Sequence, residues 1–195
     1  MVTDVGTFEV VKAVALGLAL AAAVGLRIFV PLLALSTASL AGVVRLGPGM
    51  DWLGSVPALV IFLVATLVEL AAYKVPWLDN TLDAAGAPIA VLAGGVLAAS
   101  VLPTDDPLLR WVLAAVAGGA AAGTVHLSVA MVRKLSSLTT GGLANIVIAL
   151  AEAVGSFLLS VAAILLPLLA AVAAALLLLG LAAAARRLLA HRRVA

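Results

Sequence analysis

The sequence predicts an all-α fold: a polytopic bundle of transmembrane helices. Hydrophobic residues make up 66% of the 195 residues and charged residues only 10%, and the mean hydropathy is +1.33. A soluble domain has about a quarter charged residues, so this chain has too few polar groups to cover a globular surface in water. Its long Leu, Ala and Val runs do not alternate with polar residues, which argues against a transmembrane β-barrel.

Composition also narrows the classes of function. The chain has no cysteine, which excludes disulfides, thiolate metal sites and cysteine catalysis. We expect neither a metal nor a cofactor, since no His/Glu cluster has metal-ligand spacing and no glycine-rich phosphate loop follows a strand. Gly155 and Ser156 with His126 lack the full motif of an intramembrane serine protease, so we expect no enzyme. The basic residues are spread over chain ends and loops, which indicates a lipid bilayer as partner and no nucleic acid.

Residues 1–195 are expected to form one transmembrane domain. Between Lys12 and Arg45 lie 32 residues whose only charge is Arg27. A helix of that length would measure about 48 Å, against a hydrocarbon core of about 30 Å. The first span is therefore expected to be broken near 25–31, where Gly25 and Pro31 interrupt the helix. Six spans are predicted in all, at about 11–40, 53–74, 83–103, 108–132, 142–164 and 167–186, followed by a basic cytoplasmic tail at 187–195.

Two of the predicted turns need a separate argument. Residues 76–83 form a polar turn in which Asn80, with Asp79 beside it and Asp83 three residues on, favours the start of the third span. Residues 143–185 carry Glu152 as their only charge and are too long for one span. We expect this block to fold back near Pro167, with the proline opening the last helix.

Charge asymmetry supports six spans and places both termini in the cytoplasm, with the chain in the cell membrane. With six spans, eight basic residues share one side and only Arg45 and Arg110 lie on the other. The eight are Lys12, Lys74, Arg133, Lys134, Arg186, Arg187, Arg192 and Arg193.

The sequence is compatible with an internal repeat. The Ala-Ala-Ala triplets at 21–23 and 120–122 match at an offset of 99, which also sets Arg27 against His126. Spans one to three would then correspond to spans four to six, as two inverted three-helix repeats.

Four ionisable side chains lie within the predicted spans: Arg27, Glu69, His126 and Glu152. Counting from the cytoplasmic ends places Arg27 and Glu152 near mid-membrane, and Glu69 and His126 in the cytoplasmic half. Arg27 can then pair with Glu152, and Glu69 with His126. Unpaired charges at such depths cost several kcal/mol, so each should have a partner or water.

Each of these groups allows a structural and a functional interpretation. The Arg27–Glu152 pair either locks two helices together or forms a substrate and proton site. Glu69 either extends toward Lys74 at the headgroups or lines a polar mouth. His126 either makes a packing hydrogen bond or acts as a pH-sensitive relay.

Polar residues also gather around the fifth span. Asn145, Glu152, Ser156 and Ser160 share one helical face. Thr139 and Thr140 precede it in a Thr-Thr-Gly-Gly turn, which either is an ordinary helix start capped by Thr140 or binds an anionic group. Gly119 and Gly123, like the ladder Gly86, Ala90, Gly94 and Ala98, favour close helix packing within the fold, with a homodimer as the alternative.

Three motifs carry a family resemblance: GLRIFVPL at 25–32, PWLDNTLD at 76–83 and TTGGLAN at 139–145. In this order, over nearly the whole chain, the sequence resembles a bacterial membrane-protein family known as domain of unknown function 4126. That family often has proline after the asparagine of the last motif, where this chain has Ile146. The resemblance implies an integral-membrane protein and no substrate. The motif positions that it brings forward are Arg27, Asp79, Asn80, Asp83, Thr139, Thr140 and Asn145.

The leading hypothesis is a small transporter or permease for a small solute or ion. Its site would lie between the broken first helix and the polar face of the fifth span. One alternative is a non-transporting membrane scaffold or assembly partner, whose polar groups satisfy one another in a dry core. Another is a lipid-handling protein, which would need a polar groove open sideways to the bilayer.

Overall fold

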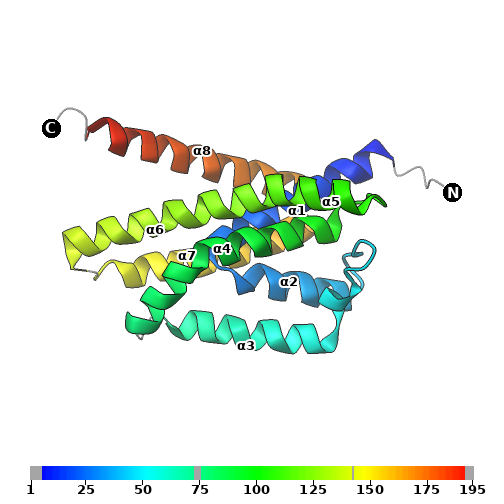
Figure 1. Ribbon diagram of the computed structural model, residues 1–195, viewed down its shortest axis with the longest axis horizontal. Coiled ribbons are helices and arrows are strands. Elements are labelled where there is room, and N and C mark those ends of the chain that lie inside the picture. The colour runs from blue at the N-terminus through cyan, green and yellow to red at the C-terminus, as the bar shows by residue number, and fades with distance from the viewer. Residues whose placement is uncertain (1–5, 73–75, 142, 192–195) are drawn as a thin grey trace.

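The computed structural model is a bundle of helices that run roughly along its longest dimension (Figure 1). It describes residues 6–72, 76–141 and 143–191, and the side chains of these residues apart from 76–84, 182 and 184–191. The described part is helical with no strand, which confirms the predicted all-α class. Its elements are α1 (Thr7–Leu26), α2 (Phe29–Leu40), the 3₁₀ turn η1 (Asp51–Gly54), α3 (Val56–Ala72), α4 (Pro76–Val101), α5 (Pro107–Leu113), the π-helical η2 (Ala114–Gly119), α6 (Ala120–Thr140), α7 (Asn145–Leu165) and α8 (Pro167–His191).

Several helices have the length and composition of membrane spans. Among the described residues, Thr7–Leu26, Pro107–Thr140 and Asn145–Leu165 are long and apolar enough to cross a bilayer. Shorter apolar helices cover Phe29–Leu40, Val56–Ala72, Ala85–Val101 and Pro167–Leu181. Large side chains such as Ile61 and Leu67 on α3 and Leu150 and Leu158 on α7 are exposed. Such an apolar surface indicates association with a membrane, while the count of six spans stays a prediction.

The first predicted span is not one broken helix but a hairpin of two. The chain reverses at Arg27, whose backbone is extended (φ −147°, ψ 127°), and α2 runs back toward the end of the bundle at which α1 begins (Figure 1). Gly17 packs against Ala98 near the end of α4, and beyond α2 the N–H of Gly47 donates to the carbonyl oxygen of Ser100 at 2.7 Å. Both arms of the hairpin therefore extend to the same end of the bundle.

This reversal changes where the first and last helices lie. Placing both termini on one side requires the segment 11–40 to cross the membrane once. In the structure α1 begins at one end of the bundle and α8 ends at the other (Figure 1), which differs from the arrangement on which that prediction rested, while the side of each terminus stays a prediction. The hairpin also gives the first half one helix more than the second, so one helix of the first half lacks a counterpart in the expected correspondence of two three-helix halves.

Two other expected boundaries are corrected. The polar turn at 76–83 is helical, because α4 begins at Pro76, and proline is well suited to the first helical position. Asn80 is thus not the residue that begins the helix, and the side chains of Asp79, Asn80 and Asp83 lie outside the described ones. The fourth segment does not end at 132 but continues to Thr140, where Gly141 takes a left-handed conformation (φ 62°, ψ 19°).

Glycines bring the helices of the bundle close together. Gly25 of α1 faces Val125 and the carbonyl oxygen of Ala122 on α6, and Gly94 of α4 faces Gly118 of η2. Gly119 and Gly123 lie against Val91 of α4, so these small residues serve packing within the fold, as predicted. A homodimer remains a separate prediction.

Adding one methyl group at Gly25 should separate α1 from α6. A Cβ there would lie 2.6 Å from the carbonyl oxygen of Ala122, and this backbone atom cannot move aside alone. We expect Gly25→Ala to lower the free energy of unfolding by about 1–3 kcal/mol, the usual cost of overpacking. Thermal unfolding in detergent measures this.

The matched control is Gly180→Ala on α8, where an added Cβ would meet nothing within 4 Å. This variant should be neutral or slightly more stable, because alanine favours helices. Equal melting temperatures for the two variants would contradict the packing argument.

Candidate functional site

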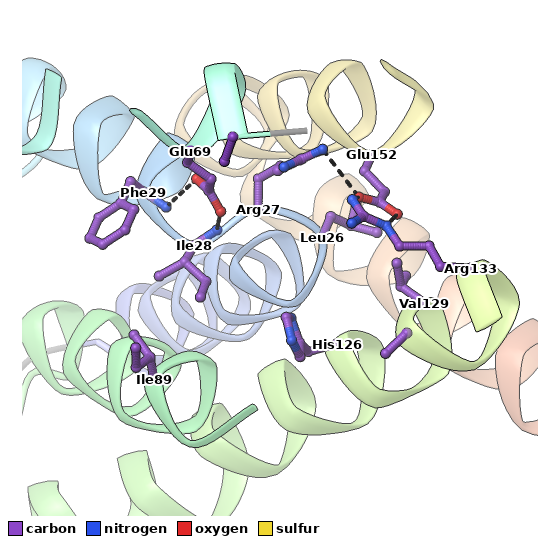
Figure 2. A pocket seen from close by; sticks show the side chains of 12 residues that line it. Leu26, Arg27, Ile28, Phe29, Glu69, Ile89, His126, Val129, Arg133 and Glu152 are labelled. Atoms are coloured by element: carbon purple, nitrogen blue, oxygen red, sulfur yellow. Dashed lines mark hydrogen bonds and ion pairs between the residues drawn. The ribbon is translucent and has the colours of Figure 1, made fainter. Parts of the chain in front are cut away.

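A cavity of about 130 Å³, largely apolar but lined by several ionisable side chains, lies beside the reversal between α1 and α2 (Figure 2). Five ionisable side chains line it, contributed by the reversal, α3, α6 and α7: Arg27, Glu69, His126, Arg133 and Glu152. The rest of the lining consists of Leu26, Ile28, Phe29, Ala72, Ile89, Val129 and Ala130. The cavity has room for a few water molecules or a small ion.

Glu152 of α7 is held by two arginines. The Nε of Arg133, on α6, donates to Oε1 of Glu152 at 2.8 Å, and its Nη2 donates to Oε2. The Nη2 of Arg27 lies 3.4 Å from the same Oε2 and donates to the carbonyl oxygen of Ala149 at 3.2 Å. Arg27 and Glu152 are 6% and 5% exposed. This triad of Arg27, Arg133 and Glu152 joins the reversal to α6 and α7.

Glu69 of α3 caps the start of α2. Its Oε1 accepts a hydrogen bond from the N–H of Ile28 at 2.7 Å, and its Oε2 accepts one from the N–H of Phe29 at 3.1 Å (Figure 2). The first N–H groups of a helix have no partner within it and carry partial positive charge, so a carboxylate stabilises them. Glu69 therefore points inward, and the alternative in which it extends toward the headgroups is wrong.

His126 lies on the α6 side of the same cavity (Figure 2). Its ring packs against Gly86 of α4, where an added Cβ would lie 2.5 Å from Nε2. The sequence-based pairing of Arg27 with Glu152 is confirmed by their ion pair. Glu69 and His126, which were also expected to meet, line one cavity.

The other predicted site residues lie elsewhere, at the turn between α6 and α7. Thr139 donates its hydroxyl to the carbonyl oxygen of Leu135, and the hydroxyl of Thr140 accepts from the N–H of Ala144 at 3.3 Å. The Nδ2 of Asn145 donates to the hydroxyl of Ser137 at 2.9 Å. These contacts fix the turn, and none of the three residues lines the cavity.

The polar face of α7 is mostly a packing surface. The hydroxyl of Ser156 donates to the carbonyl oxygen of Ala23 at 2.9 Å, and that of Ser160 donates to the carbonyl oxygen of Ser156 at 2.7 Å. Both serines are fully buried. Of the face predicted at 145–160, only Glu152 reaches the cavity.

Arg133 is the site residue that the sequence argument missed. It was assigned to a cytoplasmic loop beside Lys134, but α6 continues past it to Thr140. Its position seven residues after His126 could have revealed it, because residues at that spacing share one helical face. A predicted helix that continued to the Thr-Thr-Gly-Gly turn would have placed Arg133 on the same face as His126.

Replacing Glu152 with glutamine should destabilise the protein strongly. The change leaves two buried guanidinium groups without their carboxylate, and breaking a buried ion pair in this way costs about 3–5 kcal/mol. Thermal unfolding in detergent measures the loss.

Glu9→Gln is the control, because Glu9 is exposed and pairs with Lys12 on the surface of α1. Surface pairs contribute little to stability, so this variant should unfold almost as the wild type does. A Glu152→Gln protein as stable as Glu9→Gln would mean that the triad does not hold the helices together.

Comparison with known proteins identifies one related family. A family model described as "Domain of unknown function (DUF4126)" matches residues 14–187. No curated protein and no solved structure matches the chain.

Proposed function

The chain belongs to the family described as a domain of unknown function, DUF4126, and on that premise we propose that it is a small membrane transporter for a small solute or ion. The observation that carries the proposal is the cavity at the reversal between α1 and α2, which five ionisable side chains line. Ionisable groups inside an apolar bundle are costly, and they commonly mark a substrate or ion pathway.

The reversal itself supports transport. Transporters often bind substrate where helices are interrupted, because the freed backbone groups and helix ends can contact the solute. Here the interruption places the first N–H groups of α2 and the side chain of Arg27 at one cavity. Helices α1, α2, α3, α4, α6 and α7 all contribute lining residues, so a small movement of one of them changes the space.

The rival function is a membrane scaffold, and the triad favours it. Arg27, Arg133 and Glu152 satisfy much of one another's charge in direct contact, as a dry structural core would require. A scaffold gains nothing from an adjoining cavity with further ionisable groups, however. Glu69 and His126 on that cavity favour transport.

A lipid-handling protein receives less support. A groove of about 640 Å³ lies between α2, α3 and α7, and its volume and apolar lining suit an acyl chain. Its lining is apolar except for Thr37 and Thr66. A lipid headgroup would therefore find few polar partners among the described residues.

Water access separates the transporter from the scaffold, and the natural absence of cysteine makes it measurable. Ala130 lines the cavity, whereas Leu127 on the same helix is exposed on the apolar outside. We expect Ala130→Cys, but not Leu127→Cys, to react with a membrane-impermeant maleimide from one side of the membrane. If Ala130→Cys stays unreactive from both sides while a cysteine at loop residue Val43 reacts, the cavity has no aqueous path and the scaffold is favoured.

We further propose an orientation in the membrane from the observed bundle. Lys134 and the α8 positions Arg186 and Arg187 belong to one end, and the sequence that follows α8, outside the described residues, adds Arg192 and Arg193. The α1 end carries Lys12, Arg45 and Arg110. The larger basic count favours a cytoplasmic α8 end, with α1 beginning on the opposite side.

Two exposed positions test this orientation: Val43, after α2, and Leu138, near the end of α6, are 60% and 76% exposed. We expect Val43→Cys to be labelled in intact cells and Leu138→Cys only in inverted vesicles. Labelling of both positions from the same side would contradict the arrangement of the helices.

A further inference from the structure

The start of α2 already holds an anion, and that anion is part of the protein. The carboxylate of Glu69 accepts the N–H groups of Ile28 and Phe29 at 2.7 and 3.1 Å. These two donors, together with Arg27, form what we call the α2 amide site. Backbone N–H groups at a helix start bind free anions through the same hydrogen bonds that a carboxylate accepts.

A second observation points to a ligand at this place. Arg27 is 6% exposed and lines the cavity, and its Nε has no hydrogen-bond partner among the described groups. A buried guanidinium donor without a partner is costly, so the site has hydrogen-bonding capacity that Glu69 does not use. An anion in the cavity could accept from it.

The charge balance of the cavity leads to the same ligand. Arg27 and Arg133 carry two positive charges, and Glu152 and an ionised Glu69 carry two negative ones. When Glu69 takes up a proton, the side chains of the cavity together carry one uncompensated positive charge inside an apolar bundle. Such a charge is unfavourable there unless a counterion enters.

We infer that a small inorganic anion, such as chloride, replaces the carboxylate of Glu69 at the α2 amide site when Glu69 is protonated. The inference rests on the proposed function and names its substrate class. One proton and one monovalent anion enter together, so the charge of the site does not change. Because each favours binding of the other, the two should be transported in the same direction.

The size of the cavity limits the ligand. About 130 Å³ accommodates a chloride or nitrate ion with a few water molecules, but no nucleotide or sugar phosphate. The described groups that face Glu69 across the cavity are Arg27 at the reversal, His126 and Arg133 on α6, and Glu152 on α7. His126 is a second ionisable side chain on this cavity, so its contribution must be measured separately.

The test is thermal unfolding of the purified protein in sodium chloride, in sodium nitrate and in sodium gluconate of equal concentration, between pH 5 and pH 8. Gluconate is too large for the cavity. We expect chloride or nitrate to raise the Tm of the wild type at pH 5 and much less at pH 8. At a concentration about 100-fold above Kd, the rise should be about 5–10 °C for a chain of this size.

Three variants assign the effect. Glu69→Gln removes the charge that competes, so the small anion should raise its Tm equally at pH 5 and pH 8. Glu9→Gln should retain the wild-type behaviour, in which the small anion raises the Tm at pH 5 and much less at pH 8. His126→Gln should retain the difference between the two pH values if Glu69 is the group that takes up the proton.

The wild-type measurement needs no variant, so the inference can fail even if Glu69→Gln does not fold. Equal Tm in chloride, nitrate and gluconate at every pH would overturn it. So would a pH dependence that is unchanged in Glu69→Gln or absent from His126→Gln.

Flux into proteoliposomes separates this inference from the proposed function. Chloride uptake that is driven by an inward proton gradient supports both. A Tm that depends on the anion, without any flux, supports the anion site and contradicts the proposed transporter function. Flux of another solute, with a Tm that chloride and nitrate do not change, contradicts the anion site and supports the proposed transporter function.

Discussion

The placement of charge inside an apolar bundle constrains this structure more than any other factor. Four charged side chains meet at one cavity, and each of them contacts an opposite charge or a backbone dipole. None of the four could be buried alone without a large desolvation cost. The helices that carry them, together with the reversal at Arg27, must therefore meet at one place, and the rest of the packing follows from that meeting.

The reversal between α1 and α2 depends on these charges in two ways. Arg27 leaves the helix in an extended conformation, and its guanidinium reaches toward α7. The next two residues, Ile28 and Phe29, lie at the start of α2, and the carboxylate of Glu69 accepts hydrogen bonds from their N–H groups, which have no acceptor within the helix. Pro31 falls in that first turn, where its missing N–H breaks no helical hydrogen bond. Small residues then allow the hairpin to lie deep in the bundle, with Gly25 against α6.

Much of this organisation could be predicted from the sequence. Composition gave the helical membrane class, and counting residues from the span ends gave the pairing of Arg27 with Glu152. The reversal could not be predicted, because Gly25 and Pro31 are equally compatible with a kink in a continuing helix. Whether the chain turns back depends on a carboxylate 41 residues away that caps α2, a contact with no local signal. Arg133 was missed because a basic residue near a span end is usually a loop residue.

The cap on α2 has a consequence for how the cavity can change. The carboxylate of Glu69 stabilises the reversal only while it carries negative charge and stays on the N–H groups of Ile28 and Phe29. If Glu69 leaves or loses its charge, the start of α2 must find another acceptor or unwind. A structural ion pair needs no such alternative, and the triad of Arg27, Arg133 and Glu152 has that character. The two carboxylates of the cavity therefore have different roles: Glu152 holds the helices together, and Glu69 occupies a place that another anion can take.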